Sequence, residues 1–419
     1  MGIKLRLVFM SFLQFFIWGA WLITVSNYWF ITRQWGGAEF GAIFSTLGFA
    51  SLVMPAITGI IADRWVDAEK LYGILHLLGG LALACIPAVD DPGTFFWVIF
   101  AAMLCYMPTL SLSNSVAYHI LKTRRFDVVT VFPPIRVWGT VGFIAAMWVT
   151  NLTGNKASAH QFHIAAAAAA VLGLYSFTLP KCPPPGSVAP DAPWVRLLGL
   201  DAFKLFASGR TALFFIFSMF LGAALQLTNM YGDVFLSEFA SIPAYSGSLV
   251  VKYSTIIMSI SQVSETLFIL AIPFFLKRFG IKRVMLISMF AWVLRFAFFA
   301  YGDPGGGLWM IILSCIVYGM AFDFFNISGS LFIETTTDSR MRASAQGLFM
   351  MMTNGFGAVF GSLASGYVIQ RYFTDHGGKD WRGIWLSFAG YALLIAFAFA
   401  IFFKHRHDPA APAEPRPGP

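Results

Sequence analysis

Four long apolar stretches of this chain each carry a stripe of polar, ionisable or aromatic side chains at helical spacing. Residues at i, i+3, i+4 and i+7 share one face of a helix, so the members of a stripe face the same neighbour. Ionisable groups inside a bilayer are costly and are therefore candidates for function. The stripes are Arg136, Thr140 and Phe143; Gln226 and Asn229; Gln262 and Glu265; and Tyr318, Phe322 and Asn326, with Asp323 one step round the helix.

Together these side chains offer amides, carboxylates, hydroxyls and aromatic planes. A carboxylate and an amide suit a pair of sugar hydroxyls, whereas an aromatic face and amides suit a nucleobase. Glu265 and Asp323 each lie near the middle of an apolar helix, so they are the candidates for a functional charge. The composition indicates a ligand that has a flat ring and hydroxyls.

Each stripe also has a purely structural interpretation. Amides often hold transmembrane helices together, aromatic rings pack, and a cation at a helix start can mark the membrane edge. The two carboxylates could be neutralised by Arg136 or by Arg295. Gln14 and Trp18 lie one turn apart in the first apolar stretch and are further candidates to line a cavity.

The elements that carry these side chains are expected to be membrane helices. Hydrophobic residues make up 58% of the chain and charged residues 11%, whereas a soluble domain carries about 25% charged residues. In lipid the backbone must satisfy its own hydrogen bonds in helices or closed barrels, and barrel strands alternate in polarity. Apolar runs such as 284–299 and 385–403 instead predict an all-α polytopic membrane protein.

Twelve apolar segments are expected, with the longest break between the sixth and the seventh. This plan of two fused halves divides the chain into an N-terminal six-helix bundle (1–180), a cytoplasmic linker (181–210), a C-terminal six-helix bundle (211–404) and a cytoplasmic tail (405–419). The expected segments are 5–32, 39–62, 71–89, 94–121, 134–153, 161–180, 211–235, 251–276, 283–301, 308–333, 343–370 and 383–403.

The distribution of positive charge predicts that both termini are cytoplasmic. With twelve spans and both ends inside, twenty Lys and Arg residues lie on the cytoplasmic side and six outside. Cytoplasmic loops collect Lys and Arg, so the net charge of +8 indicates orientation rather than nucleic-acid binding. Asp233 and Glu334 fall near segment ends and are expected at a membrane interface.

The end of the second segment resembles a loop signature of the major facilitator superfamily. It runs from Gly59 through Asp63 and Arg64, and a basic stretch at 277–283 occupies the equivalent loop of the second half. The resemblance is partial, because 66–69 does not carry the usual glycine and arginines. We expect Gly59 to permit close packing, and Asp63 with Arg64 to hold a cytoplasmic gate.

Longer blocks resemble the bacterial nucleoside:proton symporter family of that superfamily, and the similarity runs from about residue 3 to 405. The blocks are 11–15, 132–136, 259–262, 301–304, 321–329 and 342–347. The resemblance implies a proton-driven nucleoside importer with twelve membrane helices. It also implies a nucleoside site and a coupling residue. The site residues are Arg136, Thr140, Phe143, Gln226, Asn229, Gln262, Glu265, Tyr318 and Phe322, and the coupling residue is Asp323, with Glu265 as a second carboxylate.

Two branches of the family remain open from the sequence. The stretch 264–267 is similar to the broad nucleoside permease, and the stretches 114–116 and 404–409 are similar to the xanthosine permease. The substrates expected of the first are purine and pyrimidine nucleosides such as uridine and adenosine. A sugar:proton symporter is the less favoured alternative, since carboxylates, amides and aromatic rings also suit a sugar.

Other function classes lack their sequence signals. No phosphate-binding glycine loop, metal-ligand cluster or Ser/His/Asp set is evident, so neither an enzyme nor an ATP-driven pump is expected, and no cofactor. A sensor that binds without transport is disfavoured by the short linker. The expected partners are a nucleoside, protons and membrane lipid. The expected state is a monomer in the bacterial cytoplasmic (inner) membrane.

Overall fold

The computed structural model describes residues 2–184, 200–337, 341–375 and 378–404, so the predicted tail and part of the predicted linker lie outside the described residues. The first half contains α1 (Ile3–Gly19), α2 (Val25–Asn27), η1 (Tyr28–Thr32), α3 (Gly37–Arg64), α4 (Ala68–Cys85), η2 (Ile86–Ala88), α5 (Pro92–Thr123), α6 (Val128–Leu152) and α7 (His160–Ser176). The second half contains η3 (Leu200–Ala207), α9 (Gly209–Glu238), η4 (Phe239–Ser241), α10 (Leu249–Lys252), α11 (Ser254–Tyr301), α12 (Leu308–Thr336), α13 (Arg342–Met350), η5 (Met351–Gly357), α14 (Ala358–Tyr372), β1 (Thr374–Asp375), β2 (Gly378–Lys379) and α15 (Trp381–Phe402).

The prediction of an all-helical membrane protein is confirmed. Within the described residues, nine helices are long and apolar enough to cross a bilayer, with mean hydropathies of 1.2 to 2.2. The first predicted segment is interrupted, because α1 ends at Gly19 and the helix resumes as α2 and η1. The sixth corresponds to α7, which is only 17 residues long. The count of twelve spans stays a prediction.

A break inside α11 lies where the sequence predicts the loop between the eighth and ninth segments. Gly280 has φ 74° and ψ 167°, in the middle of the basic stretch 277–283. A positive φ of this kind is strained for residues with a Cβ, so glycine is required at this turn. α11 is therefore two helices that follow one another through a sharp bend.

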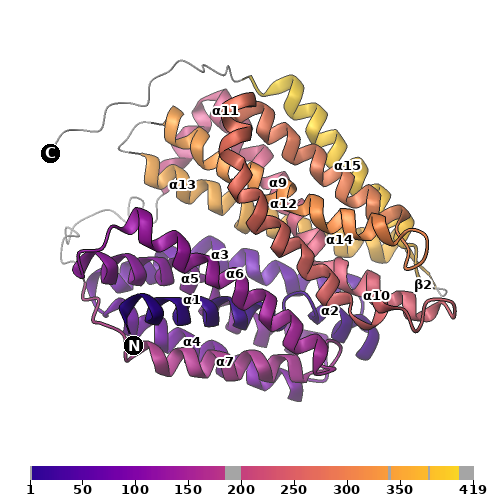
Figure 1. Ribbon diagram of the computed structural model, residues 1–419, viewed down its shortest axis with the longest axis horizontal. Helices are drawn as coiled ribbons and strands as arrows, with labels where there is room; N and C mark the ends of the chain where they lie inside the picture. The colour runs from indigo at the N-terminus through magenta and orange to yellow at the C-terminus, as the bar shows by residue number, and fades with distance from the viewer. Residues whose placement is uncertain (1, 185–199, 338–340, 376–377, 405–419) are drawn as a thin grey trace.

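The two halves of the chain form two helical layers that lie one on the other (Figure 1). They converge at the end of the molecule where α2 and α10 lie, and they diverge toward the end where α13 lies. The main helix contacts that join them are those of α3 with α14 and η5, of α6 with α11, and of α2 with α9. This arrangement matches two fused bundles that meet along a central seam.

Glycines allow the backbones of α3 and α14 to touch across this seam. A Cβ on Gly41 would lie 2.4 Å from the carbonyl oxygen of Ser362, and one on Gly366 would lie 2.6 Å from the carbonyl oxygen of Gly37. Both distances are shorter than any real Cβ contact, so only glycine fits there. Small residues at helix crossings are the usual means of close approach in membranes.

The outer surface of the bundle is apolar. Leu270, Leu394 and Trp97 expose 77%, 72% and 67% of their surface. A soluble protein does not expose so many large apolar side chains, whereas a lipid environment solvates them. Inside, buried Trp and Phe side chains fill the helix contacts of both halves.

One expectation about the loops and helix ends is wrong. Gly59 allows no close packing here, because a Cβ at that position would meet no atom within 4 Å. Asp233, expected at a membrane interface, is completely buried within the protein, because α2 of the other half covers it. Glu334, in contrast, is exposed and pairs with Arg342 at 2.9 Å.

Candidate substrate-binding site

The clearest feature of the site is a flat aromatic wall on α12. Tyr318 and Phe322, one helical turn apart, have ring centroids 6.1 Å apart and an interplanar angle of 9°. Trp292 meets Tyr318 edge-on, with centroids 5.8 Å apart and an angle of 88°. Because Trp292 holds the first ring in place, the pair forms a rigid surface against which a planar group can stack.

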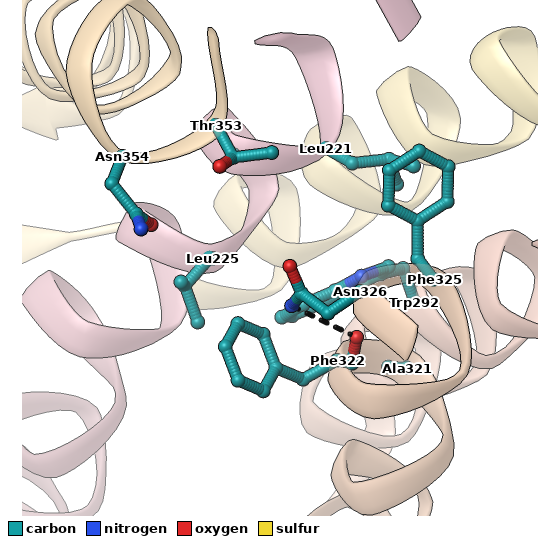
Figure 2. A pocket seen from close by; sticks show the side chains of 10 residues that line it. Leu221, Leu225, Trp292, Ala321, Phe322, Phe325, Asn326, Thr353 and Asn354 are labelled. Atoms are coloured by element: carbon teal, nitrogen blue, oxygen red, sulfur yellow. Dashed lines mark hydrogen bonds between the residues drawn. The ribbon is translucent and has the colours of Figure 1, made fainter. Parts of the chain in front are cut away.

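A small cavity lies beside this wall, where α12 faces α9 and η5. Figure 2 shows Phe322 and Asn326 on one side of it, with Leu225 and Asn354 across from them. The amide of Asn326 donates to the carbonyl oxygen of Phe322 at 3.2 Å, which fixes its orientation. The volume of the cavity is about 20 Å³, which is room for about one water molecule.

A larger groove of about 450 Å³ adjoins the cavity at Asn326. It runs along α12 to Glu334, and Gln346 and Phe349 of α13 form its other side. Its volume falls in the range of roughly 300–1,000 Å³ that small-molecule sites occupy. The groove therefore leads from the wall toward the end of the molecule where the halves diverge.

The second-half amides and Glu265 lie on the helices next to this wall. Gln226 is buried and its Oε1 has no hydrogen-bond partner among the described residues, whereas Asn229, three residues on, is half-buried. Gln262 and Glu265 are half-buried on α11, also three residues apart. Polar groups left without partners in an apolar interior are suited to binding a ligand, since a ligand can satisfy them.

The first half contributes α6, which packs against α11. The guanidinium of Arg136 lies over the ring of Phe15, 4.0 Å from its centroid, and Phe143 is buried while Thr140 is half-buried. Arg136 lies close enough to Glu265 to interact with it electrostatically. Within the described chain the two form no ion pair, so a gap separates their charged groups.

Asp323 is the most isolated carboxylate of the group. It is almost fully buried beside Phe322, and its Oδ2 has no partner among the described residues. It lies within electrostatic range of Glu265. The structural alternative, a neutralising ion pair with Arg136 or Arg295, is not present in the described residues. A buried carboxylate without a cation is suited to binding a proton.

Gln14 does not line the cavity, contrary to expectation. It is completely buried inside the first half, where its amide donates to Thr109 at 2.9 Å and accepts from Tyr72 at 2.6 Å. Trp18 packs against Tyr106 with ring centroids 5.6 Å apart. Both side chains therefore tie α1 to its own half.

The cytoplasmic gate residues stay predictions. Asp63 is exposed, and neither it nor Arg64 forms an ion pair with a described residue. The Nε and one terminal nitrogen of Arg64 are buried without a partner. In this structure the two halves diverge at the end of the molecule where these residues lie, so the gate is not formed.

Some residues of the cavity are missing from the sequence-based set. Thr353 and Asn354 lie in η5, a π-helical stretch whose wider turn presents them to α12. Polar side chains inside an apolar segment indicate a candidate site. The neighbouring Gly355 and Gly357 instead favour an interpretation as a helix-packing face. Among the described residues, no group of three or more His, Cys, Asp or Glu side chains is placed to hold a metal ion.

Comparisons with known proteins show which family the chain belongs to. The family model described as nucleoside H+ symporter matches residues 1–408. The chain belongs to the nucleoside H+ symporter family. The resemblance noted from the sequence is thereby confirmed, and the homologues are permeases rather than enzymes. Membership also makes the chain a multi-pass protein of the bacterial inner membrane.

Two curated relatives of the symporter family come from Escherichia coli strain K12. The nucleoside permease NupG is 52% identical over 408 residues, which are 97% of each chain. The xanthosine permease is 53% identical over 410 residues, which are 98% of each chain. These two values are too close to separate the two branches.

Solved structures agree with the family. A crystal structure of the nucleoside transporter NupG bearing the D323A substitution has a TM-score of 0.93 at 52% identity, covering 96% of this chain and all of that one. A POT family transporter has a TM-score of 0.70 at 13% identity, with 95% of each chain covered, which shows the fold alone.

Proposed function

We propose that this symporter imports purine and pyrimidine nucleosides such as uridine and adenosine, each together with a proton. The observation that carries the proposal is the stacked pair Tyr318 and Phe322 next to the unpartnered carboxylate of Asp323. A base can stack on the wall, and the proton has a carboxylate to bind. Both requirements of a nucleoside symporter then meet on one helix, α12.

The nucleoside lies between the halves in this proposal. The base stacks on Tyr318 or Phe322 of the second half, or on Phe143 of the first. Its polar edge binds the amides of Gln226 and Asn229 on α9. The ribose hydroxyls bind Gln262 and Glu265 on α11. Residues of α6 close the site from the first half. The full set is Arg136, Thr140, Phe143, Gln226, Asn229, Gln262, Glu265, Tyr318 and Phe322.

Transport follows by alternating access. A carboxylate, Asp323 or Glu265, takes a proton when the site faces outward. Neutralising it removes most of the free-energy cost of enclosing a charge in a dry cavity. The nucleoside then fills the cavity, the outer side closes and the inner side opens. Water reaching the carboxylate from the cytoplasm restores its charge and releases the proton.

The topology belongs to the same proposal. We infer twelve spans in bundles 1–180 and 211–404, a cytoplasmic linker 181–210 and a cytoplasmic tail 405–419, with both termini inside. The groove along α12 and α13 then faces the cytoplasm. Gly59, Asp63 and Arg64 lie at that same side, where they form the gate in the outward-facing state. The functional unit is a monomer in lipid.

A xanthosine-preferring permease is the second candidate, and the near-equal identities of 52% and 53% to the two relatives support keeping it. A sugar:proton symporter is a weaker third candidate. The stacked rings argue against it, because a sugar needs no second aromatic plane.

Competition binding to the purified protein separates the three. Uridine and adenosine are expected to displace each other, xanthosine to bind no more than about tenfold tighter than uridine, and glucose not to compete. Gln262→Ala is expected to weaken uridine binding by about tenfold, the value of one hydrogen bond to a buried partner. Strong preference for xanthosine would select the second candidate, and competition by glucose alone would select the third.

A further inference from the structure

Arg295 is a completely buried cation in the second half that the proposed transport cycle does not use. Its Nε donates to Thr228 Oγ1 on α9 at 3.1 Å. One terminal nitrogen donates to the carbonyl oxygen of Ser314 on α12 at 2.7 Å and to Ser261 Oγ on α11 at 3.3 Å. A single guanidinium therefore connects three of the helices that surround the site.

The same guanidinium also lies between two aromatic rings. Its central carbon is 4.7 Å from the centroid of Tyr318 and 4.9 Å from that of Phe299. Within the described chain, the second terminal nitrogen is buried without a hydrogen-bond partner, and Arg295 forms no ion pair. Aromatic faces and neutral oxygens thus stabilise a charge that has no carboxylate beside it.

The partners of Arg295 are sequence neighbours of the proposed ligand-binding side chains. Thr228 lies between Gln226 and Asn229 on α9. Ser261 directly precedes Gln262 on α11, and Ser314 lies one turn before Tyr318 on α12. The guanidinium is therefore in contact with all three helices and with the Tyr318 ring.

We propose that Arg295 is the positioning residue of the nucleoside site. It holds the Tyr318 ring by a cation–π contact and sets the register of the polar stripes on α9 and α11, without touching the ligand. The planar fork of arginine makes this possible, because several donors leave it in fixed directions. The inference rests on the proposed function, since Tyr318 is taken as a stacking surface for the base.

A purely structural role is the competing explanation, and α11 and α12 supply a matched control for it. Ser288 Oγ donates to the carbonyl oxygen of Ala321 at 2.6 Å, and Ser288 is completely buried. This hydrogen bond joins the same two helices, about two turns from Arg295 along α11 and one turn beyond Tyr318 on α12. Ser288→Ala therefore removes a contact between the same helices and leaves the cation–π contact of Arg295 with Tyr318 in place.

The test is calorimetric titration of uridine into the full-length purified protein, together with its melting temperature. Arg295→Met is expected to weaken uridine binding at least about tenfold, since one buried cation–π contact has roughly that value. Arg295→Lys keeps the charge and is expected to recover part of the affinity. Ser288→Ala is expected to lower the melting temperature and to leave the dissociation constant within about twofold.

The double variant Thr228→Val with Ser261→Ala keeps the arginine and removes its two side-chain acceptors. This variant provides the test if Arg295→Met does not fold. It is expected to weaken binding as well. If Arg295→Met folds and binds uridine with unchanged affinity, the inference is overturned and the proposed function stays intact. If Arg295→Met does not fold, unchanged uridine affinity in the double variant overturns the inference in the same way. If the wild-type protein bound no nucleoside, both would fall.

Discussion

Asn27 of the first half donates a hydrogen bond to Asp233 of the second half, with Nδ2 and Oδ2 2.5 Å apart. Both side chains are completely buried, and Thr255 donates to the same oxygen at 3.0 Å. Lys156 lies nearby, where it donates to Ser254 Oγ at 2.8 Å, and burial lowers its pKa while the Asp233 carboxylate opposes that shift. This polar cluster joins the halves at the end opposite the groove.

Breaking this contact is expected to loosen the closed end. Asp233→Ala removes an acceptor that two buried donors share, and a buried donor left without its partner costs roughly 1–3 kcal/mol. Hydrogen exchange of the backbone amides at 25–32 should accelerate at least about tenfold, because opening of this end becomes easier. Ser246→Ala, in an exposed turn, is the control. Equal protection in both variants would show that the contact does not hold the halves together.

The glycine contacts between α3 and α14 make a second prediction. Gly41→Ala places a methyl group 2.4 Å from a backbone oxygen, which neither helix can relieve without moving apart. Overpacking of this kind costs about 1–3 kcal/mol, so the melting temperature and the transport rate should both fall. Gly59→Ala, on the same helix, meets no atom within 4 Å and should leave the melting temperature unchanged. A tolerated Gly41→Ala would mean that this seam is not tightly closed.

Asp323→Asn is expected to abolish proton-driven accumulation while leaving uridine binding within about tenfold of the wild-type value. The amide keeps the shape of the side chain but cannot exchange a proton. Binding and gradient-driven uptake are measured on the same preparation. Asp90→Asn, which breaks an exposed ion pair with Arg33, is the matched carboxylate control and should transport normally. Normal accumulation by Asp323→Asn would exclude that residue as the proton carrier.

The start of α5 gives a prediction for acid pH. Asp91 caps this helix by accepting from the backbone N–H of Thr94 at 2.8 Å, and this hydrogen bond lowers the pKa of the carboxyl. A lowered folded-state pKa contributes stability above the unfolded-state value, and that stability is lost as pH falls through the folded-state value. Asp91→Ala should therefore melt below the wild type at neutral pH, and the difference should shrink as the pH falls below the usual carboxyl pKa of 3.8 and through the lowered folded-state value. A pH-independent difference would contradict the capping role.

The membrane helices could be predicted because the signal is local. A run of apolar residues specifies a span by itself, and Gly280 with its basic neighbours marked the bend in α11. The aromatic wall could be predicted for the same reason, since Tyr318 and Phe322 share one helix face. These features need no knowledge of which helices become neighbours.

What could not be predicted depends on contacts between distant segments. Asp233 lies near a segment end, yet α2, some two hundred residues away in the sequence, buries it. Arg295 belongs to none of the four polar stripes found in the sequence. Its hydrogen-bond partners come from α9, α12 and the part of α11 before the bend. Asn354 depends on a π-helical turn, whose register no periodicity indicates.

Radiolabelled uridine uptake into proteoliposomes, with and without an inward proton gradient, tests whether the protein is a proton-coupled nucleoside importer. Uridine is expected to accumulate only with the gradient, and excess adenosine but not glucose is expected to block the accumulation. Asp323→Asn should show binding without accumulation in the same vesicles. Equal uridine uptake with and without the gradient, or no uridine uptake alongside gradient-driven uptake of a sugar, would contradict this function.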